Sequence, residues 1–309
     1  MNQPKRHHYL NRAILANFAG SDGKVRVYDR IKNEYRAQVP QQIGCENHLY
    51  RTEPDREGNC ANLEPILAGI DDEGFHVLRK LYAQSPITNG EFDSLTYFIA
   101  LQNSRLPCFM NGVGDIEGEM LTRAIRMMMA DEASIRRLYR FRPTSKMTED
   151  EFVAMSLQHG KSIVSVPTKS RRLEIMNSSA VDLFKVIRDE FKGVKIMIPA
   201  EGSSFITSDC PVVSSNRIQR FSSPGLASLK LDGTYIIYSS HPKCLIELSR
   251  EDSGVSVHSV NVYGVRSVNK HLADFSSGFV FGQSKTDIEA AIAAADIAGK
   301  PPTPRVTLC

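Results

Sequence analysis

The stretch from residue 195 to residue 249 contains four short runs, KIMIPA (195–200), SFITSD (204–209), TYIIYS (234–239) and KCLIELS (243–249). Each run is rich in β-branched, aromatic or other apolar residues, and turn residues lie between them, which is the pattern of β-strands. The residues before this stretch follow a helical pattern instead. Because helices and strands occupy largely separate parts of the chain, we predict an α+β fold.

The helical pattern begins near residue 62, and its apolar residues recur at the three-to-four spacing of helices that bury one face. The predicted helices cover residues 63–81, 91–104, 115–141, 148–158 and 176–192. A break is expected in the first of them at Asp71–Gly74, and Pro107 is expected to stop the second. The methionines of the third helix, at 127–129, are assigned to the core, since Met at helical spacing is typical of packing.

The two ends of the chain add further elements. Residues 25–42 predict a β-hairpin, and the segment FVFG (279–282) predicts a strand between two helices at 259–275 and 285–298. We expect one domain over residues 1–309, made of an N-terminal motif and hairpin (1–61), a helical middle (62–193) and a C-terminal region of mixed strands and helices (194–309) around one sheet.

The composition is that of a folded protein, with 41% hydrophobic and 24% charged residues and a net charge of +3. No apolar run approaches the roughly 20 residues that cross a bilayer, and the N-terminus lacks a secretory pattern. We therefore expect a cytoplasmic protein that does not bind membranes. The six cysteines are too sparse for a disulfide framework and form no close pair of zinc ligands, so they are expected as reduced thiols.

Four separated segments carry a family resemblance. They are the opening His7-His8-Tyr9, ENHLY (46–50), QNSRLP (102–107) and FITSDCP (205–211). Together they resemble the bacterial domain-of-unknown-function family number 4238, over nearly the whole chain. Two positions depart from the family pattern: Leu10-Asn11 stands where members usually continue with Val-Pro, and Cys210 stands where Asn is frequent. The resemblance implies a shared fold and site, and it brings no reaction with it.

If these segments converge, they form a polar pocket. His7 and His8 are candidates for acid–base catalysis near neutral pH, and Asp209 is a candidate to orient an imidazole. Arg105 offers a planar charged fork for phosphate or carboxylate. The candidate substrate-binding residues are Tyr9, Gln102, Arg105, Arg137 and Arg140.

Each of these side chains also has a structural interpretation. On this interpretation, Arg105 pairs with Asp209, Gln102 bonds exposed backbone at a helix end, and Asp209 caps a turn before Pro211. A metal bound by a histidine and Asp209 is a weaker hypothesis, because transition metals need three or four ligands and His48 stands outside any ligand motif. We predict no metal and no cofactor.

A basic segment bears on the substrate. Five cations fall within eleven residues and alternate with two aromatic residues: Arg136, Arg137, Arg140, Arg142 and Lys146, with Tyr139 and Phe141. Lys169, Arg171 and Arg172 form a second cluster. This pattern suits a phosphate backbone with stacked bases, and a solvated helix end gives the same pattern.

The leading hypothesis is therefore a nuclease-like enzyme, a phosphodiester hydrolase whose partner is RNA or DNA. One alternative is a non-catalytic module that binds an anionic ligand or a partner protein through the same pocket. Another is a small-molecule hydrolase. The sequence leaves the substrate, the oligomeric state and catalysis itself undetermined.

Overall fold

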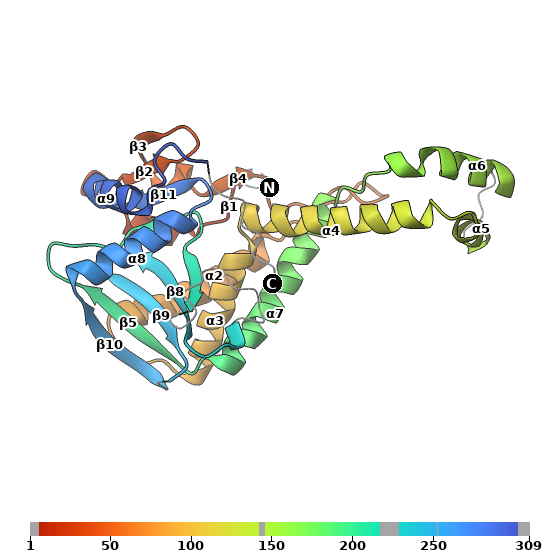
Figure 1. Cartoon of the computed structure of the whole chain (residues 1–309). Coiled ribbons are helices and arrows are strands. Elements are labelled where there is room, and N and C mark those ends of the chain that lie inside the picture. Colours follow the sequence, from red (N-terminus) through yellow and green to blue (C-terminus); the bar gives the residue numbers. More distant parts are fainter. Residues whose placement is uncertain (1–5, 142–145, 217–228, 252, 302–309) are drawn as a thin grey trace.

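The computed structural model describes residues 6–141, 146–216, 229–251 and 253–301 of the chain. The predicted α+β class is confirmed: a hairpin stands near the N-terminus, helices fill the middle, and strands and helices alternate towards the C-terminus (Figure 1). The helices of the described ranges include none with the length and apolarity needed to span a membrane.

A five-stranded sheet forms the centre of the molecule. Its order is β10-β5-β9-β8-β7, and the neighbours are antiparallel except for the parallel pair β10 and β5. The strands are β5 (Gly193–Pro199), β7 (Val212–Asn216), β8 (Thr234–His241), β9 (Cys244–Ser249) and β10 (Gly254–Val260). Three of the four quoted runs therefore form strands of this sheet, as predicted. β7 and β10 were not predicted.

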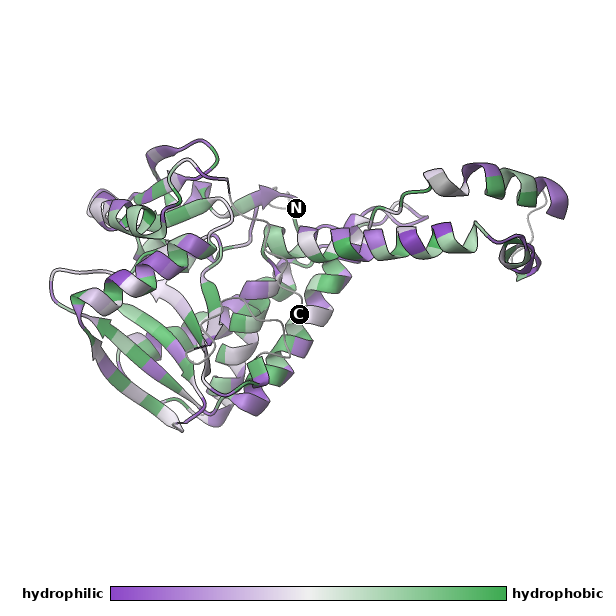
Figure 2. Cartoon of the chain, in the orientation of Figure 1, coloured by the Kyte–Doolittle hydropathy of each residue, from purple (hydrophilic) through white to green (hydrophobic). Residues whose placement is uncertain are grey.

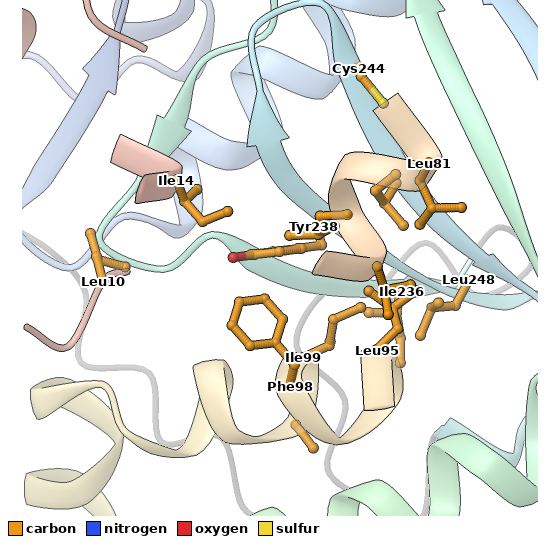
Figure 3. Close-up of a cluster of buried hydrophobic side chains, with 14 of the residues drawn as sticks. Leu10, Ile14, Leu81, Leu95, Phe98, Ile99, Ile236, Tyr238, Cys244 and Leu248 are labelled. Atoms are coloured by element: carbon orange, nitrogen blue, oxygen red, sulfur yellow. The ribbon is translucent and has the colours of Figure 1, made fainter. Parts of the chain in front are cut away.

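Helices cover both faces of this sheet. Alternate side chains of a strand point to opposite faces, so neighbouring residues of β8 join different clusters. Ile236 and Tyr238 of β8 join one buried cluster with α3 (Asn89–Ser104) and α7 (Lys169–Glu190), while Ile237 joins a second cluster with α8 (Val262–Phe275). Figure 3 shows the first cluster, in which the Phe98 ring meets the Tyr238 ring edge-on at 5.8 Å. Hydrophobic residues are frequent along the central strands, where polar ones interrupt them (Figure 2).

The expectation of one sheet is wrong, because the described strands form three. A four-stranded sheet has the order β3-β2-β11-β6, and β1 pairs with β4 as a separate ribbon. The strands of the four-stranded sheet are β2 (Val25–Asp29), β3 (Glu34–Gln38), β6 (Thr207–Ser208) and β11 (Phe279–Gly282). The helix α9 (Lys285–Ala295) packs on this sheet. The run SFITSD is a strand at only two residues, since the chain leaves the β11 edge at Asp209 and passes through Pro211, which has no N–H for a ladder. It enters the other sheet as β7.

The first of the predicted helices is α2 (Glu64–Tyr82), and it runs without the break predicted at Asp71–Gly74. α2 and α3 approach closely at Gly74, because a Cβ there would lie 2.3 Å from Cγ of Phe98. The acidic residues that suggested a break are accommodated on one helix. Glycine at this position thus serves helix packing and does not end the helix.

The predicted helix 115–141 is two helices. α4 (Pro107–Met128) starts earlier than expected, with Pro107 in its first turn, and ends before α5 (Glu132–Phe141). α5 packs on α6 (Glu149–His159) at the far end of α4, and the three form an arm that projects from the sheets (Figure 1). Met127 is 77% exposed and Met128 is 43% exposed, so their assignment to the core is wrong. The arm has too few neighbours to bury both sides of α4.

The remaining short elements are α1 (Arg12–Asn17), β1 (Arg6–His8), β4 (Cys45–Asn47) and two 3-10 turns at Pro40–Gln42 and Gly160–Ser162. The predictions for the hairpin, for the helices 91–104 and 148–158, and for the strand 279–282 are confirmed. α7 begins seven residues before its prediction, at a cap in which the Thr168 hydroxyl accepts from the N–H of Arg171.

Candidate functional site

The strand that carries both histidines is held by the segment 44–47. β1 pairs with β4, with His7 opposite Glu46, and the backbone N–H groups of Tyr9 and Leu10 donate to the Gly44 carbonyl at 2.9 and 3.1 Å. Gly44 has a φ of +61°, and a Cβ there would lie 2.8 Å from Cβ of Leu10. Because side chains alternate along a strand, this anchoring buries His7 and leaves His8 half-buried.

His7 is a structural histidine. It is 2% exposed, its Nδ1 accepts a hydrogen bond from the Tyr50 backbone N–H at 2.9 Å, and its ring stacks on the Tyr50 ring at 5.6 Å. A ring nitrogen that accepts a backbone hydrogen bond carries no proton, so this imidazole is neutral. The Tyr50 hydroxyl in turn donates to the His8 carbonyl at 3.2 Å. His7 and Tyr50 together fasten β1 to the segment that follows β4.

His8 has a different environment. Its Nε2 is buried and has no hydrogen-bond partner among the described residues. Burial lowers the pKa of His8, and the positive charges of Arg12, Arg105 and Arg6 lower it further, while a backbone hydrogen bond to Gln41 opposes them. The imidazole is therefore neutral near pH 7, and Nε2 is the nitrogen that remains to accept a proton.

A chain of hydrogen bonds joins Tyr9 to the buried side chains of Gln102 and Arg105 and to the half-buried Asp71. Nε2 of Gln102 donates to the Tyr9 carbonyl at 2.7 Å, and a guanidinium nitrogen of Arg105 donates to Oε1 of Gln102 at 2.5 Å. The other terminal nitrogen of Arg105 donates to both carboxylate oxygens of Asp71, at 2.8 and 2.9 Å. Burial lowers the pKa of Arg105, and the Asp71 charge more than offsets it, so the guanidinium stays charged.

Arg105 is 1% exposed, so it lies beneath the surface, and its two terminal nitrogens are engaged by Asp71 and Gln102. The expectation that it pairs with Asp209 is wrong. Asp71 was missed because the DDEG segment suggested a helix break. The signal was present in the spacing, since Asp71 falls on the same face of α2 as Leu67, Gly74 and Leu78, all of which are buried.

Asp209 holds a turn. Its carboxylate accepts from the Ser277 N–H at 2.8 Å, from the Ser277 hydroxyl at 3.1 Å and from the Phe279 N–H at 3.1 Å. Burial raises the pKa of Asp209 to about 6 despite these donors. The expectation that Asp209 caps the turn before Pro211 is wrong, because its carboxylate bonds Ser277 and Phe279, which lie 68 and 70 positions further along the chain. These hydrogen bonds do not orient either histidine.

Asp209 nevertheless acts on Tyr9, the residue that follows His8, through its charge. Burial raises the pKa of the Tyr9 phenol, and the charges of Asp209 and Glu46 raise it further. The phenol is therefore protonated at all ordinary pH values. The structure thus brings together His7, His8, Tyr9, Gln102 and Arg105 directly, and Asp209 electrostatically.

The described cations of the basic segment, at 136, 137, 140 and 146, lie elsewhere. They belong to the end of the arm, beyond the 22 residues of α4, which span about 33 Å (Figure 1). Arg136 pairs with Glu132, Glu149 and Asp150, and Arg140 pairs with Glu149 at 3.2 Å. Arg137 is exposed, and Arg142 lies outside the described residues. Arg137 and Arg140 therefore do not line the same site as His8.

The second cluster joins α7 to its neighbours. Arg171 pairs with Glu117 of α4, and Arg172 bonds Asn111 and Asp115 of α4. The Lys169 ammonium donates to the His48 carbonyl. These cations stabilise packing within the chain.

No group of three or more His, Cys, Asp and Glu side chains within the described ranges is placed to hold a metal ion. An open pocket is lined by the loop 52–61 and Ser170. Two carboxylates, Glu53 and Asp55, line it, so its charge does not favour an anion. Among the described titratable groups, His8 is the best candidate for proton transfer, because its Nε2 has no hydrogen-bond partner.

Comparison with known proteins agrees with the resemblance seen in the four segments. The family model described as protein of unknown function (DUF4238) matches residues 6–286. No curated protein and no solved structure matches the chain.

Proposed function

The chain belongs to the DUF4238 family, whose function is unknown, and we propose that it cleaves phosphodiester bonds of nucleic acid, with His8 as the acid–base group. The observation that carries the proposal is the environment of His8. Its Nε2 is buried without a partner among the described residues, and the charges of Arg6, Arg12 and Arg105 act on the ring. Positive charge around an unbonded neutral imidazole suits a phosphate diester.

The chemistry assigns different tasks to these groups. Neutral His8 accepts at Nε2 a proton of the attacking water, whose oxygen bonds to phosphorus as the P–O bond to the leaving sugar oxygen breaks; protonated His8 then returns the proton to that oxygen. Exposed Arg6 and Arg12 attract the phosphate charge. Arg105 is buried and paired with Asp71, so it acts on His8 through its field and does not clamp the substrate. His7, Tyr50 and Gln102 hold the strand and the backbone around His8 in place.

The test is cleavage of a labelled single-stranded RNA and a single-stranded DNA by the purified chain, each with and without Mg²⁺. His8→Gln is expected to lower the cleavage rate by about 10²–10⁴-fold, the usual contribution of an acid–base group. His76→Gln is the matched control, because His76 is exposed on α2 and is remote from β1 in the sequence. Absence of cleavage in all four assays, or full activity of folded His8→Gln, contradicts the proposal.

A second candidate is non-catalytic binding of an anionic ligand at the same place. It is favoured by the hydrogen bonds of Gln102, Arg105 and Asp209, which are all directed to protein groups. His8 would then be the single titrating contact. Inorganic phosphate that raises the pKa of His8 in an NMR titration, without cleavage of any nucleic acid, identifies this function.

A further inference from the structure

Two cysteines that are far apart in the sequence lie side by side in the fold. Sγ of Cys108 is 3.6 Å from Sγ of Cys210, although 102 positions separate them along the chain. Both residues are partly exposed to solvent. Cys210 follows Asp209 directly, and Cys108 stands at the base of the arm.

The two thiols have unequal environments. Cys108 is in the first turn of α4, where no side chain caps the free backbone N–H groups. A hydrogen bond from Cys210 lowers the pKa of Cys108, and the Ser277 hydroxyl and the Phe109 N–H act in the same direction against burial and the Asp209 charge. The contact with Cys108, together with burial, raises the pKa of Cys210. Cys108 is thus the thiol of the pair that ionises more readily, and Cys210 is the one that holds its proton more tightly.

The distance is suited to bond formation. A disulfide has an S–S length of about 2.05 Å, so the sulfurs must approach by about 1.5 Å. Cys210 lies between β6 and β7, in a segment where its N–H and carbonyl both bond the Ser208 hydroxyl. A change in the two side-chain torsions brings the sulfurs together more readily than a shift of either backbone segment.

We propose that Cys108 and Cys210 form a thiol–disulfide exchange site that reacts with a low-molecular-weight disulfide and closes into an intramolecular disulfide. The site is independent of the function proposed for His8. Nothing in the sequence pattern indicated it, because the two cysteines come from different regions of the chain.

The reaction has two steps. The Cys108 thiolate attacks one sulfur of the small disulfide, forms a mixed disulfide and releases one thiolate, which takes up a proton from water. Cys210 then loses its proton to solvent and attacks Sγ of Cys108, which expels the second small thiolate, and this is protonated in turn. The two protein thiols lose two electrons and two protons, and the small disulfide is reduced to two thiols.

The experiment treats the reduced full-length chain with glutathione disulfide and maps its cysteines by mass spectrometry of unreduced peptides. The expected result is loss of one pair of thiols per chain and a peptide cross-linked between Cys108 and Cys210. A wild-type chain that keeps both thiols overturns the proposal. So does a cross-link that forms with hydrogen peroxide and does not form with glutathione disulfide.

Variants test the order of the steps. Cys210→Ser is expected to accumulate glutathione on Cys108, because the resolving thiol is missing, while Cys108→Ser loses the cross-link and gains no stable adduct on Cys210. Cys60→Ser is the matched control, since Cys60 is half-buried in the loop 52–61 and is expected to leave the cross-link unchanged. Folding of each variant is checked by thermal unfolding. An adduct on Cys60 in preference to Cys108 in the Cys210→Ser chain overturns the assignment of the attacking thiol.

Discussion

The pair of Asp71 and Arg105 gives the sharpest test of how the segments are held together. Arg105 is 1% exposed and donates twice to Asp71, whose side chain is 17% exposed. Removing one member of a buried ion pair leaves the other charge unpaired and costs about 3–5 kcal/mol. Because water reaches Asp71 in part, we expect Asp71→Ala to lower the free energy of unfolding by about 3 kcal/mol, the lower end of that range.

The assay is thermal and denaturant unfolding of the full-length chain. Unfolding entropy is about 2.1 cal/mol/K per residue, or about 0.65 kcal/mol/K for 309 residues. A loss of about 3 kcal/mol therefore lowers the Tm by about 5 °C. Asp72→Ala is the matched control, because Asp72 is exposed on the same helix and the change from Asp to Ala raises the helix propensity equally in both variants.

The control Asp72→Ala is a surface substitution, and such substitutions usually change the free energy of unfolding by no more than about 0.5 kcal/mol. Equal Tm values for Asp71→Ala and Asp72→Ala would refute the reasoning, because Arg105 would then be satisfied without Asp71. In a double-mutant cycle, Asp71→Ala combined with Arg105→Met is expected to cost less than the sum of the single changes, since no unpaired charge remains.

Two further predictions concern packing and pH. Gly74→Ala is expected to lower the free energy of unfolding by about 1–3 kcal/mol, because its Cβ would overlap the Phe98 ring. Gly69→Ala on the same helix is the control: its Cβ meets no atom within 4 Å, so the change should be neutral or stabilising. Similar Tm values for the two variants would contradict the prediction, because α2 would then move away from α3 freely. Burial raises the pKa of Asp209 from its ordinary value of 3.8 to about 6 in the folded chain. The folded state then holds the proton more tightly, so this stabilisation is present below about pH 4 and is lost as the pH rises through 6. Asp209→Asn should remove this part of the pH dependence in denaturant titrations between pH 4 and 7, and an unchanged slope contradicts the assignment.

Local pattern predicted those elements whose residues are stabilised by near neighbours. The hairpin at 25–42, the capped helix that starts at Asn89 and the strand 279–282 follow from periodicity, turn residues and caps. The resemblance of four segments predicted the family and drew attention to His8, Gln102, Arg105 and Asp209. Two of these, Arg105 and Asp209, are engaged by partners that lie outside the segments, namely Asp71 and the residues Ser277 and Phe279.

Long-range pairing explains most of the errors. Met127 has the spacing of a core residue, yet the arm supplies no second surface to cover it, and it is 77% exposed. SFITSD has the composition of a full strand, yet the chain leaves one sheet at Asp209 and enters another as β7. Neither outcome is encoded in the period of the local residues.

The sequence by itself determined the α+β class, the order of the main elements and the family, because helix and strand periods are local properties of the chain. Only the tertiary structure decided that Asp71 neutralises Arg105, that Asp209 bonds the turn at Ser277, and that Cys108 meets Cys210. These contacts join residues between 34 and 102 positions apart. Their partners are chosen by the way in which helices and sheets pack, and no spacing along the chain specifies that arrangement.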